Sequence, residues 1–334
     1  MSKRVLVLGA TGAMGQHLVP ILVKRGYTVD AIANFEPRVP FTGANFHKVE
    51  NAKDPEYLRE LLSRGYDAIV DFLIYPTREL CWALPWMLRS TDQYIYFSSY
   101  RIYDNKEVPI KETSPRLLDA SENIPLRKSD DYSVYKARGE NILLSMPRKN
   151  WTAVRPAITY SLMRYQLVTH EASNTVGRAF QGKKTVLPIQ AKNVQATMSW
   201  AGDIAMMLAN LLFNEKALGE IFTVATAEHH TWGEIADYYK DICGLESVWV
   251  DKEDYLNIIV DPEQPYAYAN RWQLDYDRLF ERVMDNSKVL AATGMKQEEL
   301  MPLYKGLEYE IGRCPRDFNW GNNDRMDAYL ERMK

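Results

Sequence analysis

The sequence predicts an α/β fold: a doubly wound parallel sheet with a smaller, mixed C-terminal lobe. Short apolar runs alternate with segments of helical periodicity through the first half of the chain, which is typical of a parallel sheet covered by helices on both faces. The first run, at 4–8, breaks into a glycine-rich turn, and a segment with helical spacing follows. A length of 334 residues is enough for one large domain and a second lobe.

The glycine-rich turn has the composition with which proteins hold a dinucleotide pyrophosphate. Glycines let backbone N–H groups approach the phosphates, and the helix start offers unpaired donors and the positive end of its dipole. We therefore expect a Rossmann-type domain whose cofactor contacts come from Gly9, Thr11, Gly12, Ala13, Met14 and Gly15. The alternative is a tight turn that binds no ligand, but the flanking strand and helix favour the dinucleotide.

The remaining elements follow in order along the chain. Apolar residues on spacings of three and four predict a helix over 14–25, which Gly26 ends. Further strands are predicted at 28–33, 46–49, 68–72, 94–97 and 151–155, and further helices from 55, over 78–89 and over 132–145. The polar, proline-containing segment 105–131 predicts a long functional loop.

The second half is less regular. A helix is predicted over 202–213 and a strand at 221–225. We expect the dinucleotide-binding domain to take 1–160 and to reclaim about 195–227. The substrate-binding lobe then consists of 161–194 and 228–334, and its aromatic stretch at 266–272 is expected to help close the lobe over the substrate.

Charge and cysteine content exclude several classes of protein. A net charge of −3 with mixed signs gives no basic footprint, which argues against a nucleic-acid partner. The three cysteines, Cys81, Cys243 and Cys314, are far apart and lack metal-type spacing, which favours a reducing compartment. No run approaches a signal h-region or a membrane span. We expect a cytoplasmic enzyme or binding protein with no metal and no membrane partner.

A second constellation lies more than a hundred residues after the turn. Tyr132 and Lys136 are one helical turn apart, and Tyr132 is the only one of 21 tyrosines with a lysine four positions on. A nearby ammonium favours the phenolate, which helps tyrosine act as an acid-base catalyst. Ser99 follows the strand at 94–97, at the edge where such sheets bind ligands. The alternative is a half-buried tyrosine beside a solvated lysine.

These residues resemble the short-chain dehydrogenase/reductase superfamily, and most closely its extended branch, the NAD-dependent nucleotide-sugar epimerase/dehydratase family. The resemblance covers about 3–245 and is carried by Gly9, Gly12, Gly15, Ser99 before Ile102-Tyr103, Tyr132, Lys136, Arg155-Pro156 and the segment 200–205. It implies that Ser99 polarises the substrate oxygen and that Tyr132 is the general acid-base. It also implies that Lys136 binds the nicotinamide ribose and lowers the pKa of Tyr132.

Some residues depart from the family pattern. These departures argue against two of the family's reactions and leave both NAD and NADP as possible cofactors. Ser99-Tyr100-Arg101 lacks the acids of dehydratases and decarboxylating members, so neither reaction is expected. Asn34 follows the second strand where NAD-specific members place an acid, and Arg38 could meet a 2′-phosphate, so NAD and NADP are both candidates. Asn51 takes the place of an adenine-contacting Asp. The expected cofactor residues beyond the turn are Asn34, Arg38, Asn51, Phe72 and Lys136.

The substrate should also meet residues of the second lobe. Arg164, Tyr165, His170, Asn174 and Arg178 are placed for this, although each could equally be a solvated surface residue. Besides Ser99 and Tyr132, we expect Asn174 and Arg178 to bind the substrate. Arg178 is preferred as a phosphate ligand because a guanidinium can grip a diphosphate through two parallel hydrogen bonds.

The sequence thus predicts an NAD- or NADP-dependent epimerase or ketoreductase acting on a carbinol or ketone carbon of a nucleotide-activated sugar. The resemblance favours the epimerase and implies a homodimer, with the helix at 132–145 as a candidate interface. One alternative is an NADPH-dependent reductase of a small carbonyl compound. Another is a non-catalytic, dinucleotide-binding or RNA-associated scaffold, since the segment after the strand at 68–72 resembles atypical members that include reductases and a chloroplast RNA-binding group.

Overall fold

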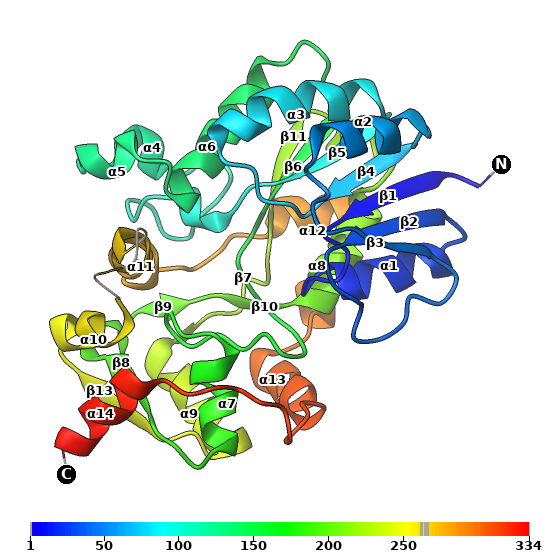
Figure 1. Ribbon diagram of the computed structural model, residues 1–334. Helices are drawn as coiled ribbons and strands as arrows, with labels where there is room; N and C mark the ends of the chain where they lie inside the picture. The colour runs from blue at the N-terminus through cyan, green and yellow to red at the C-terminus, as the bar shows by residue number, and fades with distance from the viewer. Residues whose placement is uncertain (1, 261–262, 264–266, 334) are drawn as a thin grey trace.

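A seven-stranded, fully parallel sheet forms the centre of the computed structural model, which describes residues 2–260, 263 and 267–333 (Figure 1). The strand order is β11-β6-β5-β4-β1-β2-β3. The strands are β1 (Arg4–Leu8), β2 (Thr28–Ala33), β3 (Asn45–Lys48), β4 (Ala68–Asp71), β5 (Gln93–Phe97), β6 (Trp151–Pro156) and β11 (Glu220–Val224). The predicted α/β fold is confirmed.

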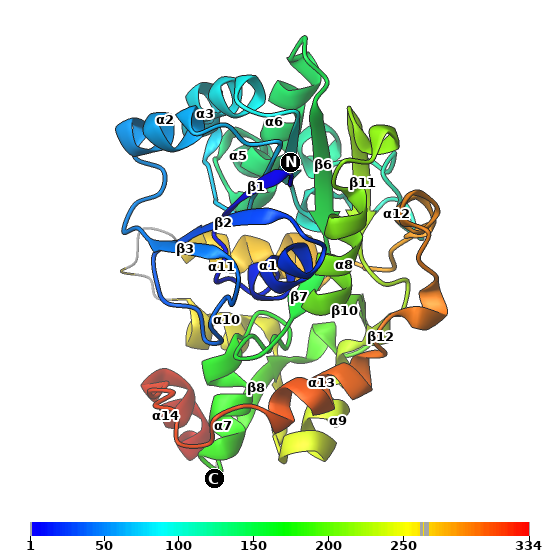
Figure 2. The same cartoon turned by 90° about the vertical axis from the view of Figure 1, so that its right-hand side faces the viewer.

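Alternate side chains of each strand serve two separate apolar layers. In β1, Val5 and Val7 pack into one layer, while Leu6 and Leu8 pack into the other. The first layer includes helices α1 (Gly15–Lys24), α8 (Ala201–Leu211) and α12 (Ser287–Thr293), and the second includes α2 (Pro55–Ser63), α3 (Thr77–Arg89) and α6 (Tyr132–Ser145). Figure 2 shows the two helical layers on opposite sides of the strands. Because both faces are covered, the strands form continuous apolar runs.

The segment between β5 and α6 is more ordered than the predicted loop. It contains two short helices, α4 (Leu117–Ala120) and α5 (Ile124–Lys128). The side chain of Asn123 caps α5 by accepting a hydrogen bond from the Leu126 N–H at 3.0 Å. Buried Leu117 and Leu126 pack with Val134 of α6 in a small apolar cluster. These short helices contain too few apolar residues to show a helical period in the sequence, which is why they were not predicted.

The smaller lobe is built on three pairs of short strands. Parallel pairs join β7 (Ile158–Tyr160) to β10 (Met198–Trp200) and β8 (Thr185–Pro188) to β13 (Ser247–Val250), and an antiparallel pair joins β9 (Gln195–Ala196) to β12 (His230–Thr231). The helices of this part are α7 (Val176–Phe180), α9 (Trp232–Cys243), α10 (Lys252–Ile259), α11 (Ala267–Gln273), α13 (Leu303–Gly312) and α14 (Asp324–Arg332). Tyr266, the first aromatic residue of the stretch at 266–272, lies outside the described residues.

The chain leaves the sheet after β6 and comes back to it. β11 pairs with β6, and α8 packs against α1, so the segment predicted to be reclaimed does contribute to the sheet. Helix α12 returns as well and packs through Val289 with the same layer, although the sequence placed it in the second lobe. The exact domain boundaries stay a prediction. Within the described part of the chain, no helix combines the length and apolar character needed to cross a bilayer.

Candidate active site

The glycine turn lies where the strand order of the sheet reverses. β1 is paired with β2 on one side and with β4 on the other, and ligands of such sheets bind outside the carboxyl ends of strands at this point. Gly9 has a φ of 74°, which favours glycine. A Cβ added to Gly15 would lie 2.3 Å from the carbonyl oxygen of Ala10, so α1 begins in direct contact with the turn. At Gly12 the nearest atom to an added Cβ would be 3.4 Å away, so its backbone stays open to an approaching group.

A central cavity of about 350 Å³ opens beside the turn. We call it the central cavity. Part of its lining comes from the glycine turn, the ends of β4 and β5, and helix α6: Gly9, Gly12, Ala13, Met14, Gly15, Phe72, Phe97, Ser98, Ser99, Tyr132 and Lys136. Its other polar and charged side chains are Arg101, Arg164, Gln166, Glu171, Gln273 and Arg278. All three residues predicted to carry catalysis are therefore in one cavity with the glycine turn.

A second cavity of about 240 Å³ lies at the carboxyl end of β2 and also has Gly9 and Gly12 in its lining. It adds the predicted cofactor residues Thr11, Asn34 and Asn51. Two cavities that meet at a glycine turn fit the two halves of a dinucleotide, with its diphosphate at the turn. Arg38 lines neither cavity, and its guanidinium donates a hydrogen bond to the carbonyl of Leu162 at 3.2 Å.

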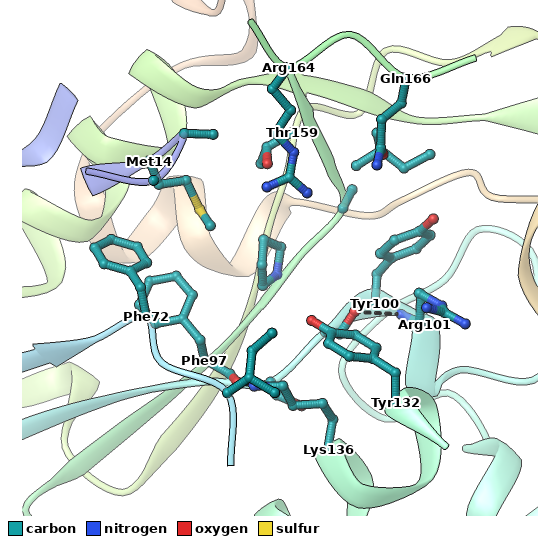
Figure 3. A pocket seen from close by; sticks show the side chains of 18 of the residues that line it. Met14, Phe72, Phe97, Tyr100, Arg101, Tyr132, Lys136, Thr159, Arg164 and Gln166 are labelled. Carbon is teal, nitrogen blue, oxygen red and sulfur yellow. Dashed lines mark hydrogen bonds between the residues drawn. The ribbon is translucent and has the colours of Figure 1, made fainter. Parts of the chain in front are cut away.

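Helix α6 brings Tyr132 and Lys136 to the cavity. The side chain of Asp131 caps this helix by accepting from the Ser133 N–H, and Tyr132, in the first turn, points into the cavity (Figure 3). Lys136 is only 2% exposed, and its ammonium donates to the carbonyl of Phe97 at 2.6 Å. The interpretation of Lys136 as a solvated lysine is therefore wrong.

The Lys136 ammonium lies close to the ring of Tyr132. Its nitrogen lies 5.7 Å from the centre of the Tyr132 ring. Burial lowers the pKa of Lys136, and this effect is partly offset by Tyr132, Asp71 and Glu140. Helix α6 can approach the sheet this closely because Gly139 faces Tyr96, where an added Cβ would collide with the hydroxyl.

Ser99 stands at the end of β5 and begins a short 3₁₀ turn. Its Oγ accepts a hydrogen bond from the Arg101 N–H at 3.1 Å, which is the dashed line in Figure 3. Because this bond uses Oγ as an acceptor, the hydroxyl proton can be donated to a substrate oxygen. Serine, tyrosine and lysine are thereby arranged around one space, as the resemblance implies.

The opposite wall of the central cavity comes from segments far away in sequence. Arg164 and Gln166 point into it from the second lobe (Figure 3). Arg278 is 3% exposed and contacts Asp277 and the hydroxyl of Tyr100, which also donates to Asp277 at 2.9 Å. Sequence reasoning missed Gln166, Glu171, Gln273 and Arg278. No local pattern joins the two pairs, because Gln166 and Arg278 are 112 residues apart.

The structure does not bring the two predicted substrate residues of the second lobe to the central cavity. Arg178 is buried and donates to the carbonyl of Lys184 and, at 2.7 Å, to Asp327 of α14. The amide oxygen of Asn174 accepts from Asn323 at 3.0 Å. Both contacts join the region of α7 to the C-terminal helix. The diphosphate preference given to Arg178 is thus not supported, because its guanidinium is already paired.

Tyr165 and His170 are buried in the second lobe, where the Tyr165 hydroxyl donates to the carbonyl of Glu310 and His170 contacts that of Val186. Burial lowers the pKa of His170 to about 4. Among the residues that the structure describes, no group of three or more His, Cys, Asp or Glu side chains could hold a metal ion.

Comparison with protein families supports the sequence resemblance. Residues 5–83 match the model of the NAD dependent epimerase/dehydratase family, which confirms the resemblance over this segment. The chain is also similar to the "Chloroplast stem-loop binding protein of 41 kDa b" of Arabidopsis thaliana, with 27% identity over 255 residues. That match covers 70% of this chain and 61% of the relative.

Solved structures share the fold across nearly the whole chain. An epimerase from Methanothermobacter thermautotrophicus has a TM-score of 0.71 at 17% identity and covers 93% of this chain and 91% of its own. The UDP-glucose 4-epimerase of Thermus thermophilus, in complex with NAD, has a TM-score of 0.67 at 19% identity, with 92% and 98% covered. The UDP-glucuronic acid 4-epimerase of Bacillus cereus, in complex with UDP-glucuronic acid and NAD, has a TM-score of 0.66 at 18% identity, with 92% and 98% covered.

Proposed function

We propose that this protein is an NAD-dependent enzyme of the short-chain dehydrogenase/reductase type that epimerises a carbinol carbon of a nucleotide-activated sugar. The observation that carries the proposal is the meeting of the glycine turn, Ser99 and Tyr132 in the central cavity. The matched family model and the NAD and UDP-sugar complexes of structural neighbours point in the same direction. Net reduction of a ketosugar would use the same residues.

The described residues fit a dinucleotide. The open backbone at Gly12 and the start of α1 would hold the diphosphate, Asn34 and Asn51 the adenosine half, and Phe72 and Lys136 the nicotinamide half. A nicotinamide bound there would supply hydride transfer to and from a carbinol carbon. NAD is favoured over NADP because Arg38 lines neither cavity.

The chain's own residues supply the proton chemistry. Tyr132 takes the proton of the substrate hydroxyl as the carbon is oxidised and gives it back as the ketone is reduced. Ser99 donates a hydrogen bond to the same oxygen, while its Oγ is held by the Arg101 N–H. The buried Lys136 ammonium lies beside the Tyr132 ring and is held there by its hydrogen bond to the carbonyl of Phe97. An epimerase must also let the ketone turn within the cavity before the hydride returns to the other face.

The proposal is tested by denaturing the purified protein and identifying the released nucleotide by mass spectrometry. Recovered NAD supports an epimerase, which keeps its cofactor through turnover. A protein that carries no nucleotide and consumes NADPH supports the reductase of a small carbonyl compound instead.

Tyr132→Phe tests the role of the phenol. Removing the hydroxyl should lower kcat about 10²- to 10⁴-fold, because a positioned acid-base group contributes about this much. The ring is retained, so the variant should keep its thermal stability and its bound nucleotide. Undiminished turnover in Tyr132→Phe would refute the assigned mechanism.

A second candidate is an RNA-associated, non-catalytic protein, which the similarity to the stem-loop binding protein favours. The net charge of −3 counts against it, since RNA binding rests largely on cationic residues. Filter binding of an RNA stem-loop at moderate salt distinguishes the two. Tight RNA binding together with a Tyr132→Phe variant of unchanged function would favour the RNA-associated protein over the enzyme.

A further inference from the structure

We propose that the substrate carries an anionic group, a carboxylate or a phosphate, near its reacting carbon, and that Arg164 and Arg101 recognise it. The inference rests on the proposed function, because Tyr132 and Ser99 mark the reacting end. It adds a substrate class: acidic sugars rather than neutral ones.

The charge of the central cavity favours an anion. Its described lining contains the cationic side chains Arg101, Lys136, Arg164 and Arg278 against one carboxylate, Glu171. Lys136 donates to the carbonyl of Phe97, and Arg278 to that of Val168, so both have partners in the protein. The carboxylate of Glu171 accepts a hydrogen bond from Gln166. Among the described residues, Arg164 is left as the cation without a partner in the protein, and Arg101, whose Nε lies 3.5 Å from a carboxylate oxygen of Asp277, is the second candidate.

Among the residues that the structure describes, none is a hydrogen-bond or ion-pair partner of the Arg164 guanidinium. The Nε of this side chain is inaccessible to solvent. Figure 3 shows the guanidinium directed into the central cavity. Arg164 is half-buried, and the part of its guanidinium that lines the central cavity is available to an anion, with which a guanidinium forms strong charge-assisted hydrogen bonds.

Two residues near Arg164 have a positive φ. Ser161 and Arg164 exchange two backbone hydrogen bonds across a tight turn, at 2.9 and 3.2 Å. Met163, inside this turn, has a φ of 64°, and Val168, in the following turn, has a φ of 54°. Both values are unfavourable for side chains with a Cβ, most of all for a β-branched valine. Strained residues of this kind concentrate at ligand sites, where the surrounding structure holds them in place.

Arg101 places the anion at the reacting end of the substrate. Its N–H is bonded to the Oγ of Ser99, and its guanidinium carbon lies 5.1 Å from the centre of the Tyr132 ring. Its Nε has no hydrogen-bond partner in the described structure, although it is 3.5 Å from a carboxylate oxygen of Asp277. A group bound here is next to the hydroxyls that handle the proton, so it belongs to the sugar ring being changed.

Binding of matched ligands to the NAD-loaded protein tests the proposal. The carboxylate pair is UDP-glucuronate and UDP-glucose, and the phosphate pair is glucose 6-phosphate and glucose; isothermal titration calorimetry measures each affinity. In at least one pair the acidic member should bind about tenfold more tightly or better, as expected for charge-assisted hydrogen bonds. The pair that shows the preference identifies the anion.

Arg164→Gln should abolish this preference and leave the affinity for the neutral member unchanged. Arg164→Lys, which keeps the charge without the planar fork, should retain part of the preference. Arg316→Gln is the matched control, because Arg316 is exposed in the same lobe and does not line the central cavity. If Arg164→Gln does not fold, Arg101→Gln provides the same comparison.

The proposal is overturned if the wild-type protein shows no preference in either pair. It is also overturned if Arg164→Gln weakens both members of a pair equally, because the arginine then binds a group that they share. Failure of the proposed function can be distinguished from failure of this inference. The proposed function fails if no NAD is recovered and no sugar nucleotide is turned over, whereas the binding preference is measured without turnover.

Discussion

Asp71 is a buried carboxyl group at the end of β4, next to the residues that line the central cavity. It is 2% exposed and accepts hydrogen bonds from the Leu73 N–H at 3.0 Å and the Tyr94 hydroxyl at 2.9 Å. Burial raises the pKa of Asp71 to about 6, although these bonds and the Lys136 cation act in the opposite direction. The ionised Asp71 carboxylate therefore lowers the free energy of unfolding at neutral pH.

Asp71→Asn should flatten the pH dependence of stability between about pH 4 and 6.5. In the wild-type protein the folded state holds this proton more tightly than the unfolded state, so the free energy of unfolding falls as pH rises from 3.8 to about 6. The difference corresponds to about 3 kcal/mol for one group with this shift. Urea unfolding at pH 4.5 and 7.5 checks it.

Asp203→Asn is the matched comparison for Asp71→Asn, because burial raises the pKa of Asp203 to about 6 as well. Each substitution should remove only the contribution of its own carboxyl group to the pH dependence of the free energy of unfolding. A slope in Asp71→Asn identical to that of the wild-type protein would contradict the raised pKa of Asp71.

At single positions, the sequence predicted which residues share the cavity where that depends on local spacing, while their catalytic roles stay a prediction. One helical turn separates Tyr132 from Lys136, and the structure places both in the central cavity with Ser99. Arg178 was preferred as a diphosphate ligand because a guanidinium can form two parallel hydrogen bonds, but this property does not distinguish Arg178 from Arg164. Only the fold shows that Asp327, 149 positions later, already pairs with Arg178.

At the scale of elements, the start of α1 separates two roles of glycine. Gly15 gives room for the helix against the backbone of Ala10, whereas at Gly12 an added Cβ would meet only the carbonyl oxygen of Gly9, at 3.4 Å. The sequence motif does not distinguish these glycines, but the structure shows that the space around Gly12 differs from the space around Gly15.

Gly12→Ala and Gly15→Ala should therefore have different effects. Gly12→Ala should retain its melting temperature, because the added methyl group meets no crowded atom, and lose about tenfold or more in NAD affinity, because Gly12 lines both cavities proposed for the dinucleotide. Gly15→Ala should lose about 2 kcal/mol of stability as well, because its Cβ collides with backbone. Thermal unfolding and NAD titration measure both, and equal melting temperatures with equal NAD affinities would contradict the assignment.

At the scale of the whole molecule, the C-terminal helix α14 is tied to the second lobe by charge. Asp327 accepts hydrogen bonds from Arg178 and from Lys183, each at 2.7 Å. Arg178 is buried, so its charge needs this partner. The contact supports the lobe without taking part in the central cavity.

Asp327→Asn should lower the free energy of unfolding by about 2 kcal/mol, the order expected for losing charged hydrogen bonds. It should leave the affinity for NAD and for substrate unchanged, since neither Asp327 nor Arg178 lines the central cavity. Calorimetric unfolding and ligand titration check this. A large loss of substrate affinity at unchanged stability would restore Arg178 as a substrate ligand.

The sequence by itself determined the sheet, the glycine turn and the Tyr132–Lys136 pair, because periodicity, turn chemistry and helical spacing are properties of neighbouring residues. Only the tertiary structure decided the opposite wall of the central cavity, the return of α12 to the sheet and the pairing of Arg178. These depend on segments more than a hundred positions apart, which meet because apolar layers on both sheet faces must be covered and buried charges must find partners.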